Sequence, residues 1–311
     1  GLHISIGSVY AWSVLTRPIM ADMGFTLSQT TWTFSLAILM LGLSAGFLGS
    51  FAEKIGPKKS GLLAMLFWVT GLFGTAYALS VHNLTLLYLF YGIIGGIGLG
   101  IGYITPVSTL VKYFPNRPGF ATGLAIMGFG FASLIAGPLM QFLVAQFGLV
   151  NNFIILGVIY LVIMGASSLY LKAPQPKHST RTSKDRSTMY VHTHGMLAND
   201  AMKTWQFGAL WWVFFINITC GIGLLSLASP MAQEAIGMTP AAAASLVGII
   251  GIFNGGGRIA WSTISDYLGR AQTYILFFMI EIVTFYLLAQ TNSALTFQIL
   301  ILLIITCYGG G

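Results

Sequence analysis

The chain has 311 residues, of which 56% are hydrophobic and only 7% are charged, and its mean hydropathy is +0.83. A soluble domain carries about 25% charged residues. The composition therefore excludes an ordinary soluble enzyme, a disordered chain and a disulfide-rich secreted module. The net charge of +7 comes without a basic face, so nucleic acid is not expected as a partner. Cys220 and Cys307 both lie in apolar runs and indicate no disulfide framework.

Ten continuous apolar runs follow one another along the chain. A membrane helix needs roughly 20 apolar residues to cross the hydrocarbon core of a bilayer, so the runs predict an all-α, polytopic membrane protein. The chain begins and ends inside apolar runs, and we expect a fragment that lacks part of the first membrane helix and everything after the tenth. The predicted spans are 1–15, 31–51, 60–81, 84–111, 120–147, 152–171, 207–231, 241–264, 273–288 and 296–311.

The charges predict the orientation of these spans. If the loop after the second span is cytoplasmic, twelve of the fourteen Lys and Arg residues lie on that side, Arg17 lies opposite, and Arg258 lies inside a span. Cytoplasmic loops of membrane proteins carry such an excess of cations. We therefore expect a multi-pass protein of the cell membrane with a cytoplasmic amino terminus.

A long polar and basic connection, 172–204, follows the sixth span. It divides the chain into a predicted six-helix bundle, 1–171, and a second, truncated bundle of four helices, 205–311. The connection is expected to be a cytoplasmic linker. His192 and His194 alone are a weak signal for a metal site, and neither a metal nor another cofactor is expected.

Two loops carry related motifs. The loop after the second span reads Gly49-Ser-Phe-Ala-Glu53-Lys54-Ile-Gly56-Pro-Lys58-Lys59. A degenerate copy after the eighth span keeps Asp266, Gly269 and Arg270. Glu53 stands at the carboxyl end of a helix, where the macrodipole opposes a negative charge, so it needs a cation or the amino terminus of another helix as partner.

This repeated pattern resembles the loop signature of the major facilitator superfamily, whose members are secondary transporters built from two six-helix bundles. The resemblance implies that Glu53 bridges the two bundles when the cytoplasmic side is closed. A tight turn without a gating role is the alternative. Further stretches resemble the oxalate/formate antiporter branch, near the monocarboxylate transporters, and these are 7–12, 98–103, 113–123 and 253–261.

Arg258 is the cation inside the eighth span, roughly 10 Å from its cytoplasmic end. An arginine at that depth is costly unless it faces water, an acid or a ligand. Its planar guanidinium matches a carboxylate, and Asn254 lies one turn earlier on the same helix face. The resemblance implies that Arg258 contacts the carboxylate of a substrate. The alternative is that Arg258 reaches the cytoplasm and pairs with Asp266.

Four aromatic residues fall where this branch has side chains that line the substrate cavity, and the resemblance assigns that role to Tyr10, Tyr103, Phe129 and Tyr308. Phe129 stands where the oxalate carrier has a tyrosine. Helix packing is the alternative for each. Glu281 lies in the middle of the ninth span, where an acid is either a proton-carrying site or a paired structural residue.

These observations predict a secondary active transporter, not an enzyme, that moves small organic anions by alternating access. Oxalate, formate, lactate and pyruvate are candidate substrates, and both exchange and coupling to a proton stay open. The expected partners are the anion and the lipid bilayer, and the expected state is a monomer. Two alternatives are a carrier of an unrelated small solute and a non-transporting membrane sensor on the same fold.

Overall fold

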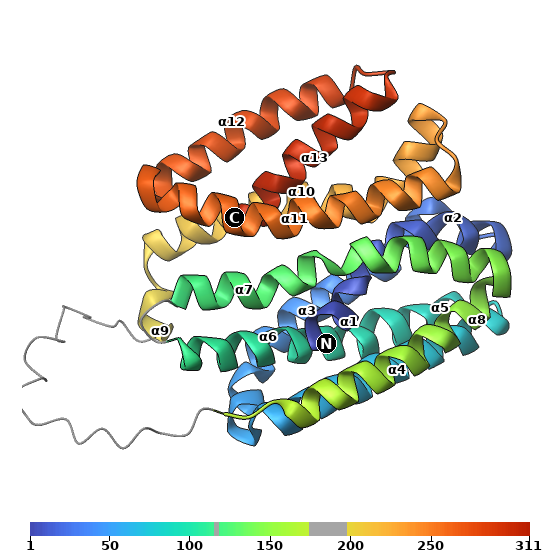
Figure 1. Cartoon of the computed structure of the whole chain (residues 1–311), viewed down its shortest axis with the longest axis horizontal. Coiled ribbons are helices and arrows are strands. Elements are labelled where there is room, and N and C mark those ends of the chain that lie inside the picture. The colour runs from blue at the N-terminus through green and yellow to red at the C-terminus, as the bar shows by residue number, and fades with distance from the viewer. Residues whose placement is uncertain (115–117, 174–197) are drawn as a thin grey trace, which may run out of the picture.

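The structure, a computed structural model, describes residues 1–114, 118–173 and 198–311, and in these residues it contains helices and no strand. The helices lie side by side along the longest axis of the molecule (Figure 1). The predicted all-α class is therefore confirmed.

The helices follow one another as the apolar runs predict. The first part of the chain forms α1 (Leu2–Ile6), η1 (Gly7–Ala11), α2 (Trp12–Met23), α3 (Leu27–Ile55), α4 (Pro57–Ser80), α5 (Leu84–Leu87), η2 (Tyr88–Gly95), α6 (Gly96–Tyr113), α7 (Pro118–Gly130) and α8 (Ala132–Tyr170). The second part forms α9 (Ala198–Ala201), α10 (Trp205–Ile236), α11 (Pro240–Leu268), α12 (Arg270–Leu288) and α13 (Ala294–Gly310).

Seven helical stretches of the described residues are long and apolar enough to cross a membrane. The predicted number of spans is larger for three reasons. The stretch 121–170 holds two predicted spans, which meet at Gly148, where the backbone turns with a φ of 82°. The first predicted span is divided into α1, η1 and α2, and α13 has 17 residues.

Local signals explain where the helices begin and end. Thr26 accepts a hydrogen bond from the backbone N–H of Gln29 at the start of α3, and the Gln29 side chain accepts one from the backbone N–H of Thr26, which forms a capping box. At the start of α11, Thr239 accepts from the N–H of Ala242. Gly56 and Gly269 end α3 and α11 with φ values of 85° and 87°, a region that favours glycine.

Small residues let the helices approach closely. A Cβ added at Gly98 of α6 would lie 2.5 Å from the backbone nitrogen of Trp68 on α4. Likewise, a Cβ at Gly130, at the end of α7, would lie 2.9 Å from Cα of Gly255 on α11. Close packing of this kind drives helix association in lipid, where no hydrophobic force acts between helices. The second contact joins the first and second parts of the chain.

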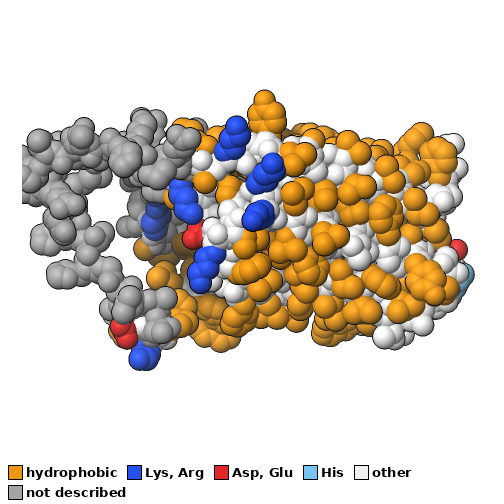
Figure 2. Space-filling view, turned by 90° about the horizontal axis from the view of Figure 1, so that it is seen from below, with side chains coloured by type: hydrophobic (Ala, Val, Ile, Leu, Met, Phe, Trp, Pro, Cys, Tyr) orange, Lys and Arg blue, Asp and Glu red, His pale blue; other side chains and the backbone are white. Residues whose placement is uncertain are grey.

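The surface agrees with a membrane protein. Figure 2 shows hydrophobic side chains over most of one face, with Lys and Arg toward one end of the molecule. Exposed apolar residues include Phe47, Leu66 and Val162, and the exposed cations Lys54, Lys58 and Lys59 lie around the turn between α3 and α4. An apolar belt with cations at one end is the pattern expected for helices in a bilayer.

Candidate functional site

A cluster of buried aromatic rings lies where η1, α7 and α13 meet. The hydroxyl oxygens of Tyr10 and Tyr308 are 2.7 Å apart and share a hydrogen bond. The ring of Tyr10 meets the ring of Phe129 edge to face, with centroids 4.8 Å apart. All three residues are buried. Side chains from the first, fifth and tenth predicted spans are thus in direct contact.

Tyr103 and His3 extend this cluster toward α6 and α1. The ring of Tyr103 meets Phe129 edge to face at 5.5 Å. The imidazole of His3 stacks on Tyr103 at 5.6 Å. His3 is the one histidine in the predicted spans, and no sequence pattern marks it as a site residue. We call the residues His3, Tyr10, Tyr103, Phe129, Asn254, Arg258 and Tyr308 the candidate site.

Arg258 and Asn254 supply the polar groups of the candidate site. The charge of Arg258 acts on His3, Tyr10, Tyr103 and Tyr308, and its guanidinium faces the Tyr10 hydroxyl. Within the described residues, Nε of Arg258 is buried and has no hydrogen-bond partner. Asn254 is fully buried, and neither polar atom of its side chain has a partner in that part of the structure. Buried polar groups are normally paired, so these atoms are unsatisfied within the described residues.

Close backbone contacts hold α11 in this position. A Cβ added at Gly309 of α13 would lie 2.3 Å from the carbonyl oxygen of Asn254. A Cβ added at Gly251, one turn before Asn254 on α11, would lie 2.4 Å from Oγ of Ser133 on α8. Glycine at these places lets α8, α11 and α13 approach closely. The structure therefore brings together all six predicted substrate-site residues, and it adds His3.

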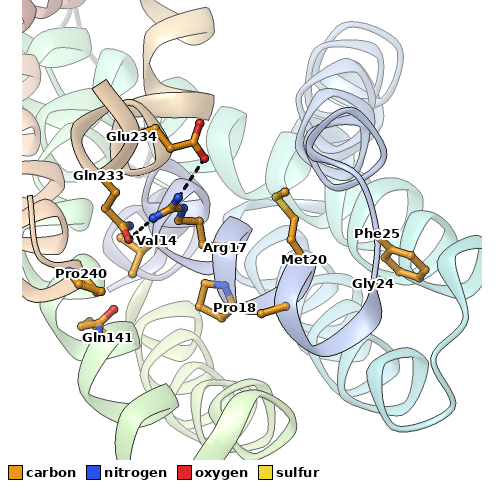
Figure 3. Close-up of a pocket in the computed structure, with 11 residues that line it drawn as sticks. Val14, Arg17, Pro18, Met20, Gly24, Phe25, Gln141, Gln233, Glu234 and Pro240 are labelled. Atoms are coloured by element: carbon orange, nitrogen blue, oxygen red, sulfur yellow. Dashed lines mark hydrogen bonds and ion pairs between the residues drawn. The ribbon is translucent and has the colours of Figure 1, made fainter. Parts of the chain in front are cut away.

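A second polar contact joins the two parts of the chain at the end of the molecule away from α9. Arg17 of α2 donates to the side-chain oxygens of Gln233 and Glu234 of α10, each at 3.2 Å (Figure 3). The pair Arg17–Glu234 is half-exposed. It borders a pocket of about 690 Å³, which Val14 and Gln141 also line. Sequence analysis uses Arg17 only for orientation, because no local pattern connects it to Glu234.

The loop motif lies at the opposite end. Glu53 forms an ion pair with Lys112 of α6, at 3.3 Å, and both side chains are about half-exposed. The partner of Glu53 is thus on a neighbouring helix of the first part of the chain, and not on α10 to α13. In the second copy, Arg270 donates to Ser265, and the side chain of Asp266 lies outside the described residues. The described members of the two motifs are Gly49, Glu53, Lys54, Gly56, Lys58, Lys59, Gly269 and Arg270.

Glu281 lies apart from the candidate site. It is 3% exposed on α12, and neither carboxylate oxygen has a hydrogen-bond partner among the described residues. Its charge acts on Cys220 of α10 and Cys307 of α13. In the described part of the chain, no group of three or more His, Cys, Asp or Glu residues could hold a metal ion.

The sequence profile of the Major Facilitator Superfamily matches residues 3–311, so the chain belongs to this family of membrane transporters. It is 29% identical to YhjX of Escherichia coli K12, an uncharacterized MFS-type transporter, over 99% of this chain and 75% of the relative. It is 25% identical to the oxalate:formate antiporter of Oxalobacter formigenes, over 89% of this chain and 64% of the relative. The chain therefore spans less than two thirds of that antiporter.

Human monocarboxylate transporter 14 is 29% identical over 51% of this chain and 31% of its own length. Among solved structures, a D-xylose-proton symporter matches with a TM-score of 0.64 and 14% identity, over 99% of this chain and 79% of that one. A bacterial homologue of the human lysosomal transporter Spinster, inward-facing and unoccupied, matches with a TM-score of 0.67 and 16% identity, over 99% and 71%. These likenesses show the major facilitator fold.

Proposed function

We propose that the protein is a secondary active transporter that moves small organic anions by alternating access between 1–171 and 205–311. Two kinds of observation support this. The family consists of membrane transporters, and relatives include an oxalate:formate antiporter and monocarboxylate transporters. Within the family, the chemistry of the candidate site favours an anion.

The observation that carries the proposal is the setting of Arg258. An arginine inside a membrane-spanning helix is strongly disfavoured unless it faces water, an acid or a ligand. Nε of Arg258 and the amide of Asn254 lack partners within the described residues, and the charge of Arg258 acts on Tyr10 and Tyr308, whose hydroxyls share a hydrogen bond. A carboxylate accepts hydrogen bonds from a guanidinium fork, an amide and a hydroxyl at once. The aromatic rings restrict the site to a small ligand.

Uptake of radiolabelled oxalate, formate, lactate and pyruvate into proteoliposomes tests this function. At least one anion should accumulate saturably, and its neutral amide analogue should not compete. Arg258→Gln should abolish uptake, and Arg258→Lys, which lacks the planar fork, should bind roughly 10- to 100-fold more weakly, because each charge-assisted hydrogen bond contributes about 1.5–3 kcal/mol.

Lys203→Gln is the control for the loss of a positive charge, because Lys203 is 77% exposed and lies outside the candidate site. Unchanged anion affinity in Arg258→Gln would contradict the role of Arg258. Uptake of an uncharged solute, with no uptake of any of the four anions, would favour the alternative that the protein carries an unrelated small solute. Binding without uptake would favour the membrane sensor.

The proposed topology places the amino terminus and the linker 172–204 in the cytoplasm of a monomer in the cell membrane. Single cysteines at Ser183 and Asn83, in a chain without Cys220 and Cys307, should then react with an impermeant maleimide from opposite sides. Labelling of both from one side would contradict this arrangement.

In the same scheme, Glu53 exchanges Lys112 for a partner on the second bundle when the cytoplasmic side closes. Coupling to a proton through Glu281 stays an alternative to exchange.

A further inference from the structure

His3 has a hydrogen-bonding arrangement that its neutral form cannot satisfy. The residue is 6% exposed on α1. Nδ1 lies 2.5 Å from the carbonyl oxygen of Ala125 on α7, and Nε2 lies 3.0 Å from the carbonyl oxygen of Tyr103 on α6. A neutral imidazole carries one N–H group and one lone pair. With two carbonyl acceptors, one contact would set a nitrogen lone pair against an oxygen lone pair.

The imidazolium form satisfies both contacts, because it donates from both nitrogens. The ring is also fixed by its neighbours: it stacks on Tyr103 at 5.6 Å and meets Phe129 edge to face at 6.0 Å. The protonation of His3 is therefore tied to the relative positions of α1, α6 and α7. These helices carry two of the aromatic residues of the candidate site.

The charged side chain that acts on His3 is positive: it is Arg258 on α11, and no carboxylate of the described residues acts on the ring. The other titratable side chain in contact with the ring is Tyr103 on α6. Two like charges repel strongly in a buried site, so Arg258 opposes a proton on His3. An anion that pairs with Arg258 removes this opposition.

We propose that His3 is the proton-binding residue of the carrier and that it takes up its proton together with the anion on Arg258. The inference rests on the proposed function, because the anion supplies the compensating negative charge. One proton from water adds to the imidazole lone pair, and no bond of the anion is broken. A monoanion and a proton thus enter the candidate site without a change of net charge, and each must raise the affinity for the other by the same factor.

Binding of radiolabelled lactate and oxalate to the purified protein, between about pH 5.5 and pH 8, tests this coupling. The affinity of the wild type should rise as the pH falls, by at most about tenfold per pH unit for one coupled proton. A weakly buffered solution with a pH dye should report about one proton taken up per anion bound. In His3→Gln, anion binding should persist with little pH dependence, and proton uptake should disappear.

His82→Gln is the matched control, because His82 is an exposed histidine in the loop before α5; it should keep the pH dependence of the wild type. Proton uptake that persists in His3→Gln would overturn the proposal and direct attention to Glu281. Loss of binding at every pH in His3→Gln alone would also overturn it, because the role of His3 would then be structural.

Nitrogen-15 NMR of histidine-labelled protein separates this inference from the proposed function. The His3→Gln spectrum identifies the His3 signals, and both His3 nitrogens should be protonated at about pH 6 when the anion is bound. A single neutral tautomer over the whole range, with or without anion, would overturn the proposal. If neither anion binds to the wild type, the proposed function fails; if an anion binds and His3 stays neutral, this inference alone fails.

Discussion

Two tyrosine hydroxyls, one on η1 and one on α13, meet inside the molecule. Tyr10 and Tyr308 are 298 positions apart, yet their oxygens are 2.7 Å apart in a buried environment. Arg258 faces the same hydroxyl of Tyr10. The bond thus links the polar centre of the candidate site to both parts of the chain. A ligand carboxylate that accepts from these hydroxyls would replace this bond, and the site would change from a closed contact to a binding site.

Phenylalanine substitutions measure this contact. Tyr10→Phe leaves the Tyr308 hydroxyl without its partner and should lower the free energy of unfolding by about 1–3 kcal/mol. Tyr10→Phe/Tyr308→Phe should cost less than the sum of the single changes, because the second change removes the unpaired group. Denaturant or thermal unfolding in detergent gives these values. Tyr286→Phe, at a tyrosine that is 65% exposed, should have almost no effect; strictly additive changes would contradict the direct bond.

Some residues of the candidate site are predictable from the sequence, and their contact partners are not. Arg258 is conspicuous because a cation interrupts an apolar run, and the tyrosines follow from the family resemblance. The partners are harder to predict, because they depend on packing between distant helices. Glu53 needs a cation on electrostatic grounds, yet only the packing of α3 on α6 selects Lys112. His3 carries a weak signal as a histidine in an apolar run, and its two carbonyl acceptors come from two other helices.

The length of the apolar runs predicts where the helices lie, and it does not predict the 3₁₀ and π-helical segments inside them. The first span contains a 3₁₀ segment, η1, and the fourth contains a π-helical segment, η2. Both arise where packing, and not composition, decides the backbone. At Gly7 of η1, an added Cβ would lie 2.4 Å from the carbonyl oxygen of Phe129. This close approach sets Tyr10 against Phe129, so the irregular turn helps to form the candidate site.

The contact between α7 and α11 tests the importance of such close approaches. Gly130→Ala would place a methyl group about 2.9 Å from Cα of Gly255, where backbone atoms must move. Overpacking of this kind costs about 1–3 kcal/mol, so the melting temperature should fall and anion binding should weaken as α11 shifts. Gly123→Ala on the same helix is the matched control, because nothing lies within 4 Å of its added Cβ. Equal melting temperatures for the two variants would contradict the tight crossing.

In the whole molecule, polar contacts join the first part of the chain (1–171) to the second (205–311) at one end and in the middle. Arg17–Glu234 joins them at the end away from α9, and Tyr10–Tyr308 joins them in the middle. At the end that carries Glu53, the ion pair that the described residues form stays within the first part. If the proposed topology holds, this arrangement corresponds to a carrier whose two parts are joined on the outer side. The sequence could not predict it, since it depends on which of two states the bundles adopt.

The ion pair Arg17–Glu234 should therefore stabilise the outer-closed state. Both side chains are about half-exposed, at 42% and 51%, so the pair contributes only about 0.2–1 kcal/mol. Arg17→Gln should increase the outward-open population by up to about fivefold, which corresponds to that energy. A cysteine at Val14, which lines the adjacent pocket and is 3% exposed, reports this opening by its rate of reaction with an impermeant maleimide.

In a background without Cys220 and Cys307, the rate should rise in Arg17→Gln and fall back in the charge-swapped pair Arg17→Glu/Glu234→Arg. Lys203→Gln, which removes a charge far from this pocket, should leave it unchanged. An unchanged rate in Arg17→Gln would mean that apolar packing alone holds the outer side closed.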